Sequence, residues 1–319
     1  MNLLASRWTR YAISAALLAI VVWVADWHAI WNELRAVDTR WVAVVAGFAL
    51  LDRVVLTYRW ELLLVIRGVR LGFWRLFRVQ LAANFLGSFL PSSLGVDAIR
   101  IAALLRSGLP ATEVIATTLV DRASIVVATL LFGSATILAL AGTRLPGDLS
   151  WVVLVTTGVA MAVCIAAMQP RVRRWATAAL VPRLPLRVRE RVTEIARATL
   201  AYRHEPGRLL WVAVVTLGLL FVRLLFAKAL TLACGVDVLF TDLLLVIPIL
   251  WILVMLPITV GGIGLQDAGY VGLMGLLGVP AAVAVSMSLI EHVVSRLVSL
   301  PGAMFLGDVT GTASHAEPR

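Results

Sequence analysis

The sequence has too little charge for a water-soluble protein. Charged residues make up only 14% of the 319 residues, whereas hydrophobic residues make up 61% and the mean hydropathy is +0.95. This composition excludes a soluble globular domain and indicates an integral membrane protein. Cysteine is also scarce, since the only two, Cys164 and Cys234, both lie in or beside apolar segments. They exclude a disulfide framework and a cysteine-based metal site.

Lysine is nearly absent, and motifs for nucleotide and metal binding are missing. Lys228 is the only lysine among 28 basic residues, and the formal net charge is +10. A codon bias towards arginine explains this pattern, and so does a need for guanidinium groups, which bind phosphate better than ammonium groups do. The sequence contains no Gly-x4-Gly-Lys-Ser/Thr motif and no His-Glu-x-x-His pair. It therefore predicts no direct use of ATP, no metal ion and no cofactor.

The apolar residues are arranged in runs long enough to cross a membrane. A spanning helix needs about 20 such residues, and the sequence predicts six firm spans at 11–27, 41–65, 111–141, 151–169, 209–233 and 280–306. Two more apolar regions, 76–107 and 241–278, are interrupted by proline and glycine, where a helix cannot easily continue. They predict broken hairpins whose arms are either re-entrant or full spans. The predicted fold is an all-α polytopic membrane protein in which residues 1–319 form a single domain.

Arginine collects on one side of these spans. Arg7 and Arg10 precede the first run, four arginines lie at 67–78, and ten arginines against three glutamates lie at 170–208. Because cytoplasmic loops are enriched in arginine, we expect a cytoplasmic N-terminus and a cytoplasmic basic loop at 170–208. Residues 186–203 of that loop are expected to form a basic helix on anionic headgroups. Nucleic-acid binding is not expected, because the loop lacks a folded module and its charge is explained by topology.

The chain also contains an internal repeat with an offset of 170 residues. The sequence Trp-Val-Ala-Val-Val at 41–45 recurs at 211–215. Single residues match at the same offset: Arg53 with Arg223, Asp97 with Asp267, Gly108 with Gly278, and Asp121-Arg122 with Glu291-His292. Short matches also arise by composition, but one offset serves both regions. The predicted spans place residues 41 and 211 on opposite sides of the membrane, so the halves 1–141 and 151–308 are predicted to form an inverted repeat, as in many transporters.

Ionisable side chains within the apolar runs are the candidate substrate site. A charge at the bilayer centre costs at least about 2.5–3.5 kcal/mol, so such groups normally turn inward and have a function. Arg53 and Arg223 are each the thirteenth residue of a span counted from Trp41 and Trp211, and the inversion makes them a symmetric pair. An ion pair between Asp52 and Arg53 is the structural alternative, although neighbouring helix residues point to different faces.

Polar residues near the broken hairpins complete the predicted site. The first hairpin supplies polar groups at and after its break, and the charged pairs of the following spans are expected to face the hairpins. Half-helix ends at such breaks expose backbone amides, which favour an anion. The predicted substrate-binding residues are Arg53, Asn84, Ser92, Ser93, Asp97, Arg100, Asp121, Arg122, Arg223, Asp267, Glu291, His292 and Arg296. No catalytic residue is predicted.

The motifs at both hairpins resemble those of a known family. The first is Leu-Pro-Ser-Ser-Leu-Gly-Val-Asp-Ala-Ile-Arg at 90–100, preceded by Asn84 and followed by Asp121-Arg122. The second is Leu-Pro at 256–257 with Gly-Gly-Ile-Gly-Leu-Gln-Asp at 261–267. Over nearly its whole length, the chain resembles the transmembrane region of lysylphosphatidylglycerol synthases, a family of flippase-like integral membrane proteins.

This resemblance implies transport of an amphiphile between the leaflets of the bacterial inner membrane. It suggests a phospholipid, a polyprenyl phosphate or a triterpenoid as cargo, and arginine within both halves favours an anionic headgroup with a phosphate. We expect no enzymatic activity, because the chain ends at Arg319 without the aminoacyl-transferring domain of the synthases. The expected partners are membrane lipids and a lipid-modifying enzyme. The chain departs from the family pattern at Val96, Asp267 and His292, where members commonly have Gly, Glu and Arg.

Two other functions fit the same sequence. One is a non-catalytic accessory subunit of a glycosyltransferase or hopanoid pathway, in which the polar interior is structural. The other is an intramembrane enzyme that uses Asp97 together with either Asp121 or His292 as acid and base. A transporter without an ATP motif is passive or ion-coupled, and its candidate proton carriers are Asp97, Asp121, Asp267, Glu291 and His292.

Overall fold

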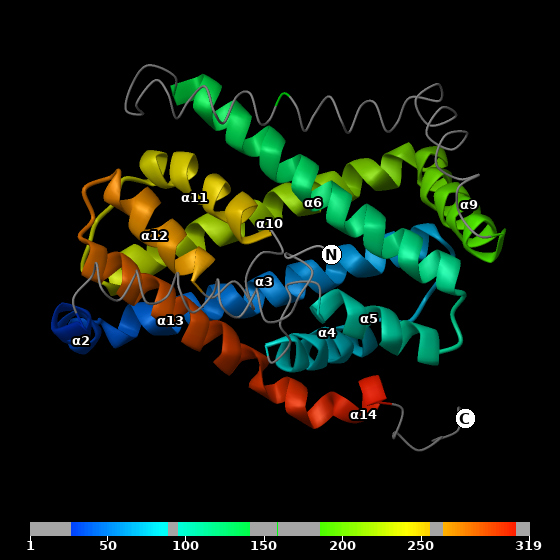
Figure 1. Ribbon diagram of the computed structural model, residues 1–319, viewed down its shortest axis with the longest axis horizontal. Coiled ribbons are helices and arrows are strands. Elements are labelled where there is room, and N and C mark those ends of the chain that lie inside the picture. The colour runs from blue at the N-terminus through cyan, green and yellow to red at the C-terminus, as the bar shows by residue number, and fades with distance from the viewer. Residues whose placement is uncertain (1–26, 89–94, 141–157, 159–185, 256–263, 311–319) are drawn as a thin grey trace. The chain divides into compact units, whose positions relative to one another are not determined.

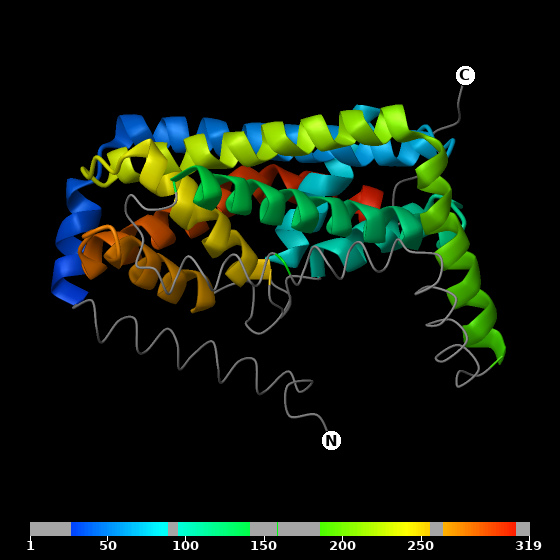
Figure 2. The ribbon, with the colours of Figure 1, turned by 90° about the horizontal axis from the view of Figure 1, so that it is seen from above.

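The computed structural model describes residues 27–88, 95–140, 158, 186–255 and 264–310. Figures 1 and 2 show the chain from two directions. The described residues form helices and contain no strand, which confirms the predicted all-α fold. The elements are α2 (Trp27–Ala36), α3 (Thr39–Ile66), α4 (Phe73–Gly87), α5 (Gly95–Arg106), α6 (Ala111–Leu140), α9 (Leu186–Ala201), η3 (Tyr202–His204), α10 (Pro206–Ala233), α11 (Phe240–Met255), α12 (Leu265–Gly275), α13 (Ala281–Ser299), η4 (Leu300–Phe305) and α14 (Leu306–Thr310).

Four helical segments in the described part of the chain are long and apolar enough to cross a membrane. They are Thr39–Ile66, Ala111–Thr136, Pro206–Ala233 and Ala281–Val309. Each corresponds to one of the predicted runs, so a polytopic helical membrane protein is confirmed. The other two predicted runs, 11–27 and 151–169, lie outside the described residues except for Trp27 and Gly158.

The outer surface of α10 shows why these helices belong in lipid. Leu210, Trp211 and Leu217 are each about half exposed or more. In water, a row of such side chains forms an apolar patch that promotes association, whereas lipid tails are as apolar as leucine itself. The exposed apolar face of α10 is therefore a lipid-facing surface.

The arms of the two broken hairpins are shorter than a full span. The helix α4 has 15 residues and α12 has 11, which correspond to about 22 Å and 16 Å at the usual rise per residue. The hydrocarbon core of a bilayer is about 30 Å thick. In each hairpin the two arms pack together, α4 against α5 and α11 against α12, as Figure 1 shows. The lengths of α4 and α12 favour the re-entrant alternative. The turns at 89–94 and 256–263 lie outside the described residues.

A similar order of elements occurs twice along the chain. A short helix, a 28-residue helix, two hairpin arms and a long helix occur as α2 to α6 and again as α9 to α13. Gly108 and Gly278 both adopt a left-handed backbone, with φ of 81° and 78°, and each is followed two residues later by a proline that introduces the next long helix. The inversion of the two halves in the membrane stays a prediction.

Contacts divide the chain into two compact units. Unit 1 comprises Met1–Tyr58, Leu71–Arg106 and Leu219–Arg319, and unit 2 comprises Arg59–Arg70 and Ser107–Gly218. In unit 1, α4 packs against α5, α13, η4 and α14, while α13 also contacts α2 and α12. Ile30 of α2 and Val285 of α13 are fully or almost fully buried in this core. Unit 1 thus assembles both hairpins around α13.

Close contact between η4 and α4 depends on a glycine. A Cβ atom at Gly302 would lie 2.2 Å from the backbone oxygen of Leu81, and backbone cannot move aside as a flexible side chain can. We expect Gly302→Ala to lower the free energy of unfolding by about 1–3 kcal/mol, as overpacking does. Gly218→Ala in α10 is the matched control, because its Cβ would meet nothing within 4 Å. Thermal unfolding of the detergent-solubilised protein measures both, and a normal melting temperature for Gly302→Ala would contradict the close packing.

Unit 2 is held by apolar and polar contacts among α3, α6, η3 and α10. Leu63, Tyr202 and Val212 form a buried cluster. The Tyr202 hydroxyl donates to the backbone oxygen of Leu63 at 3.1 Å, and burial raises the pKa of Tyr202 to about 12, so the phenol stays protonated at neutral pH. Arg67 donates two hydrogen bonds of 2.6 Å to the Glu113 carboxylate. The predicted basic helix at 186–203 is present as α9, which packs against α6, and its cytoplasmic placement stays a prediction.

Candidate functional site

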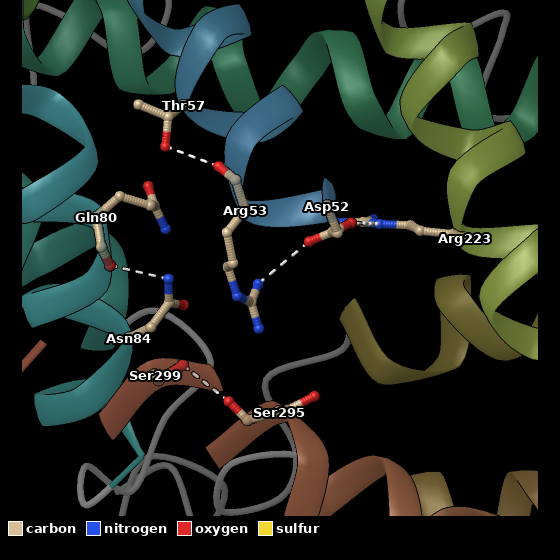
Figure 3. Close-up of polar contacts among 8 residues, drawn as sticks. All are labelled: Asp52, Arg53, Thr57, Gln80, Asn84, Arg223, Ser295 and Ser299. Carbon is tan, nitrogen blue, oxygen red and sulfur yellow. Dashed lines mark hydrogen bonds and ion pairs between the residues drawn. The ribbon is translucent and has the colours of Figure 1, made fainter. Parts of the chain in front are cut away.

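The centre of the candidate site in unit 1 is a carboxylate that contacts two arginines. Asp52 and Arg53 lie near the middle of α3, and Arg223 lies in α10. Arg223 Nε donates to Asp52 Oδ1 at 2.6 Å, and Arg53 Nη1 donates to Asp52 Oδ2 at 3.3 Å, as Figure 3 shows. The three side chains are only 13–24% exposed. The Arg223 guanidinium also lies 6.0 Å from the ring centre of Trp251, within the range of a cation–π contact.

This arrangement brings together the two arginines that the repeat singles out. It also contains the ion pair between Asp52 and Arg53 that was the structural alternative, so the two interpretations describe one cluster. The expectation that these neighbours diverge was wrong, because the long Arg53 side chain reaches the carboxylate beside it. The role of the arginines in substrate binding stays a prediction.

The Arg53 guanidinium extends into a polar region between α4 and α13. Figure 3 shows it pointing towards Asn84 of α4 and Ser295 of α13, with Gln80 on the same side of α4. Asn84 Nδ2 donates to the backbone oxygen of Gln80 at 2.9 Å, and Ser299 donates to the backbone oxygen of Ser295 at 2.8 Å. The Nε atom of Arg53 is buried without a hydrogen-bond partner among the described residues. The guanidinium therefore keeps donor capacity towards this region.

A second polar cluster joins α12 to α13. Asp267 lies in the first turn of α12, where its Oδ2 accepts a hydrogen bond of 2.8 Å from the backbone N–H of Gly264. Ser288 donates to Asp267 Oδ1 at 2.5 Å, and His292 Nε2 lies 3.3 Å from the same oxygen. One carboxylate thus fixes the start of the hairpin arm and binds two side chains one helical turn apart on α13.

Glu291 links this second cluster to the arginines. It accepts a hydrogen bond from the hydroxyl of Tyr270 on α12 and interacts electrostatically with Arg223 and Asp52. The predicted residues Glu291 and His292 therefore both face the arm α12 of the second hairpin, as expected.

Asp121 occupies a different environment in unit 2. Its Oδ1 lies 2.7 Å from Arg59 Nη2, and the two side chains are only 4% and 1% exposed. Arg59 also donates to Ser124 Oγ at 3.0 Å and to the backbone oxygen of Asp121 at 3.3 Å. Arg59 was not among the predicted site residues. This geometry is that of a structural ion pair, and the predicted role of Asp121 in substrate binding receives no support from its contacts.

The remaining predicted residues are spread over several places. Asp97 and Arg100 lie in α5, where Arg100 Nη1 approaches Asp97 Oδ1 to 3.4 Å and both side chains are buried. Arg122 of unit 2 is partly buried, and Arg296 is exposed on α13. Ser92 and Ser93 lie outside the described residues.

Three members of the site were missed at the sequence level: Asp52 as the shared carboxylate, Gln80 and Ser295. Gln80 precedes Asn84 by one helical turn, and Ser295 follows Glu291 by one turn, so helical spacing from predicted residues was an available signal.

The side chains at this site are of a kind that can bind an anion. Guanidinium groups in a region of low dielectric bind phosphate or carboxylate strongly and in defined geometry. Within the described part of the chain, no three His, Cys, Asp or Glu side chains lie close enough to hold a metal ion. The expected absence of a cofactor stays a prediction.

The chain matches a known family over most of its length. The profile of a family described as lysylphosphatidylglycerol synthase TM region matches residues 8–302, which include both hairpins and both arginines. Among curated proteins, none matches the chain.

Proposed function

Because the chain belongs to the lysylphosphatidylglycerol synthase transmembrane-region family, we propose that it moves an anionic, phosphate-bearing lipid between the leaflets of the bacterial inner membrane. Family membership makes it an integral membrane protein. In this proposal the N-terminus is cytoplasmic, the protein is not an enzyme, and membrane lipids are its partners.

The observation that carries the proposal is the pair of arginines on one carboxylate. A guanidinium has five N–H donors, yet among the described contacts Arg53 and Arg223 each donate one side-chain hydrogen bond, in both cases to Asp52. Guanidinium groups held away from water at the middle of a membrane-length helix are costly unless they have partners. A headgroup phosphate offers several acceptor oxygens and one or more negative charges, so it supplies the missing partners.

The surrounding elements suit a transporter. In many transporters the substrate site lies near the bilayer midplane, beside discontinuous helices whose ends contribute to binding. The Arg53 guanidinium faces the short arm α4 (Figure 3). Glu291 interacts electrostatically with Arg223 and accepts a hydrogen bond from Tyr270 of the short arm α12. Re-entrant arms beside a charged centre are the features expected at such a site.

Lipid transfer in liposomes tests the proposal directly. Purified protein is reconstituted with fluorescent phosphatidylglycerol or, as a zwitterionic control, fluorescent phosphatidylcholine, and dithionite is added outside. With the protein present, inner-leaflet phosphatidylglycerol is expected to be bleached rapidly, and phosphatidylcholine more slowly. Equal bleaching with and without the protein, for every anionic lipid tried, would contradict transport and leave an accessory role as the better account.

A further inference from the structure

Gln80 is a buried amide that the rest of the described chain does not use. Its side chain is 1% exposed, and among the described residues neither Nε2 nor Oε1 has a hydrogen-bond partner. The residues around it on α4, including Val79, Leu81 and Ala82, are buried and apolar. Native proteins satisfy nearly all buried polar groups, because a lost hydrogen bond is expensive inside a protein. An amide left in this state is suited to a partner that arrives with a ligand.

The position of Gln80 indicates which ligand. Gln80 and Asn84 are four residues apart on one face of α4, and Figure 3 shows both side chains on the side that faces Arg53. If Gln80 served only to neutralise the buried donors of Arg53, its Oε1 would accept a hydrogen bond from that guanidinium. Instead, Gln80 Oε1 and Arg53 Nε both lack a hydrogen-bond partner in the part of the chain that the structure describes. An acceptor and a donor that face the same region without bonding to each other can both bind a ligand that enters this region.

The chemistry of an amide and a guanidinium together defines that group. The guanidinium provides donors for a phosphate oxygen. The amide provides one acceptor and two donors, and a neutral hydroxyl is the small group that both donates to an amide oxygen and accepts from an amide nitrogen. A methyl ester or an alkyl phosphate leaves Oε1 unsatisfied, because it has no hydrogen to donate.

We propose that Gln80 is a specificity residue that binds a hydroxyl group adjacent to the phosphate held by Arg53. The preferred cargo is then a phosphodiester lipid with a hydroxylated headgroup, either the glycerol of a phospholipid or the sugar of a glycosylated polyprenyl phosphate. This inference rests on the proposed lipid transport and names the headgroup that the same site selects.

The test compares lipids that differ in the hydroxyl alone. Fluorescent phosphatidylglycerol and phosphatidylmethanol carry the same phosphodiester charge, but only phosphatidylglycerol has headgroup hydroxyls. A fluorescent polyprenyl phosphate that carries one sugar is the third lipid tested. We expect the wild type to transfer a hydroxylated lipid on the order of tenfold faster than phosphatidylmethanol, as two buried hydrogen bonds imply. Gln80→Leu should lower the ratio of these two rates from on the order of ten to about one. The hydroxylated lipid whose transfer slows in Gln80→Leu identifies the headgroup as glycerol or sugar.

Stability supplies an independent readout. Gln80→Leu should raise the melting temperature of the lipid-free protein in detergent, because leucine removes two unsatisfied polar atoms at nearly constant volume. Thr231→Val is the control for a buried polar group that is already satisfied, since the Thr231 hydroxyl donates to the backbone oxygen of Lys228 at 2.8 Å. Thr231→Val should leave unchanged the ratio between the transfer rates of the hydroxylated lipid and phosphatidylmethanol.

The outcomes separate this inference from the proposed function. If no anionic lipid is transferred faster with the protein than without it, lipid transport itself is wrong and the inference falls with it. If the wild type transfers anionic lipids but does not distinguish either hydroxylated lipid from phosphatidylmethanol, transport stands and the role of Gln80 is wrong. A lower melting temperature for Gln80→Leu would also overturn the inference, because it would show that the amide is engaged in the lipid-free protein.

Discussion

Replacing Arg53 or Arg223 with glutamine is expected to slow the transfer of phosphatidylglycerol by about 10- to 100-fold, because a hydrogen bond to a charged group contributes about 1.5–3 kcal/mol. Both side chains contact Asp52, so each single variant leaves the carboxylate with one arginine partner. The fold should therefore persist while the phosphate loses one of its two guanidinium groups. The dithionite assay in liposomes measures the rate.

Matched controls separate headgroup binding from a general effect of lost charge. Arg40→Gln removes an exposed arginine from the start of α3, and Arg208→Gln removes one from the start of α10 whose side chain is 57% exposed. Both should transfer lipid at the wild-type rate. Arg53→Lys keeps the charge without the planar fork, so an intermediate rate is expected. Wild-type rates in both Arg53→Gln and Arg223→Gln would rule out the headgroup role of this pair.

The second large effect concerns stability rather than transport. Asp121→Asn is expected to lower the free energy of unfolding by about 3–5 kcal/mol, because it leaves the Arg59 guanidinium charged and buried without its carboxylate. Thermal unfolding of the detergent-solubilised protein, followed by tryptophan fluorescence, measures this loss. Much of it should be restored in the double variant Arg59→Met/Asp121→Leu, since apolar residues of similar volume often replace a buried ion pair without loss of stability.

An exposed ion pair in the same unit is the control for Asp121. Arg208 and Glu205 are 57% and 47% exposed and 3.7 Å apart, so Glu205→Gln should change the free energy of unfolding by less than about 1 kcal/mol. If Asp121→Asn unfolded at the wild-type temperature but abolished lipid transfer, the structural assignment would be wrong. Asp121 would then belong to the substrate site, as the sequence repeat predicts.

The most informative sequence prediction concerned Arg53 and Arg223. Their burial follows from simple energetics, because an arginine in the middle of an apolar run must turn away from lipid. Their offset of 170 residues suggested that they belong together, and the structure places both on Asp52. From the sequence, Asp52 is expected only as an ion-pair partner of its neighbour Arg53. The identity of its second partner depends on how α3 and α10 are rotated about their axes, which periodicity does not give.

The same repeat was less informative for Asp121 and Glu291. The offset makes them equivalent, yet Asp121 pairs with Arg59, whereas Glu291 accepts a hydrogen bond from Tyr270 and interacts with Arg223. Related halves can keep their helix order while their side-chain partners diverge, because each partner is a separate residue with its own substitutions. Helical spacing from Asn84 indicates that Gln80 lies on the same face of its helix, but nothing in a sequence shows that a buried amide lacks a partner.

The sequence by itself determined that the protein is helical, spans a membrane and contains two interrupted hairpins, because bilayer thickness and the cost of exposed backbone groups in lipid leave few alternatives. It also placed the starts of two spans at 111 and 280, close to the first residues of α6 and α13. Only the tertiary structure decided which polar groups meet. Contacts between helices depend on their rotation, tilt and packing, so Asp52, Arg53 and Arg223 became a cluster with Gln80 nearby, while Asp121 became half of a buried ion pair.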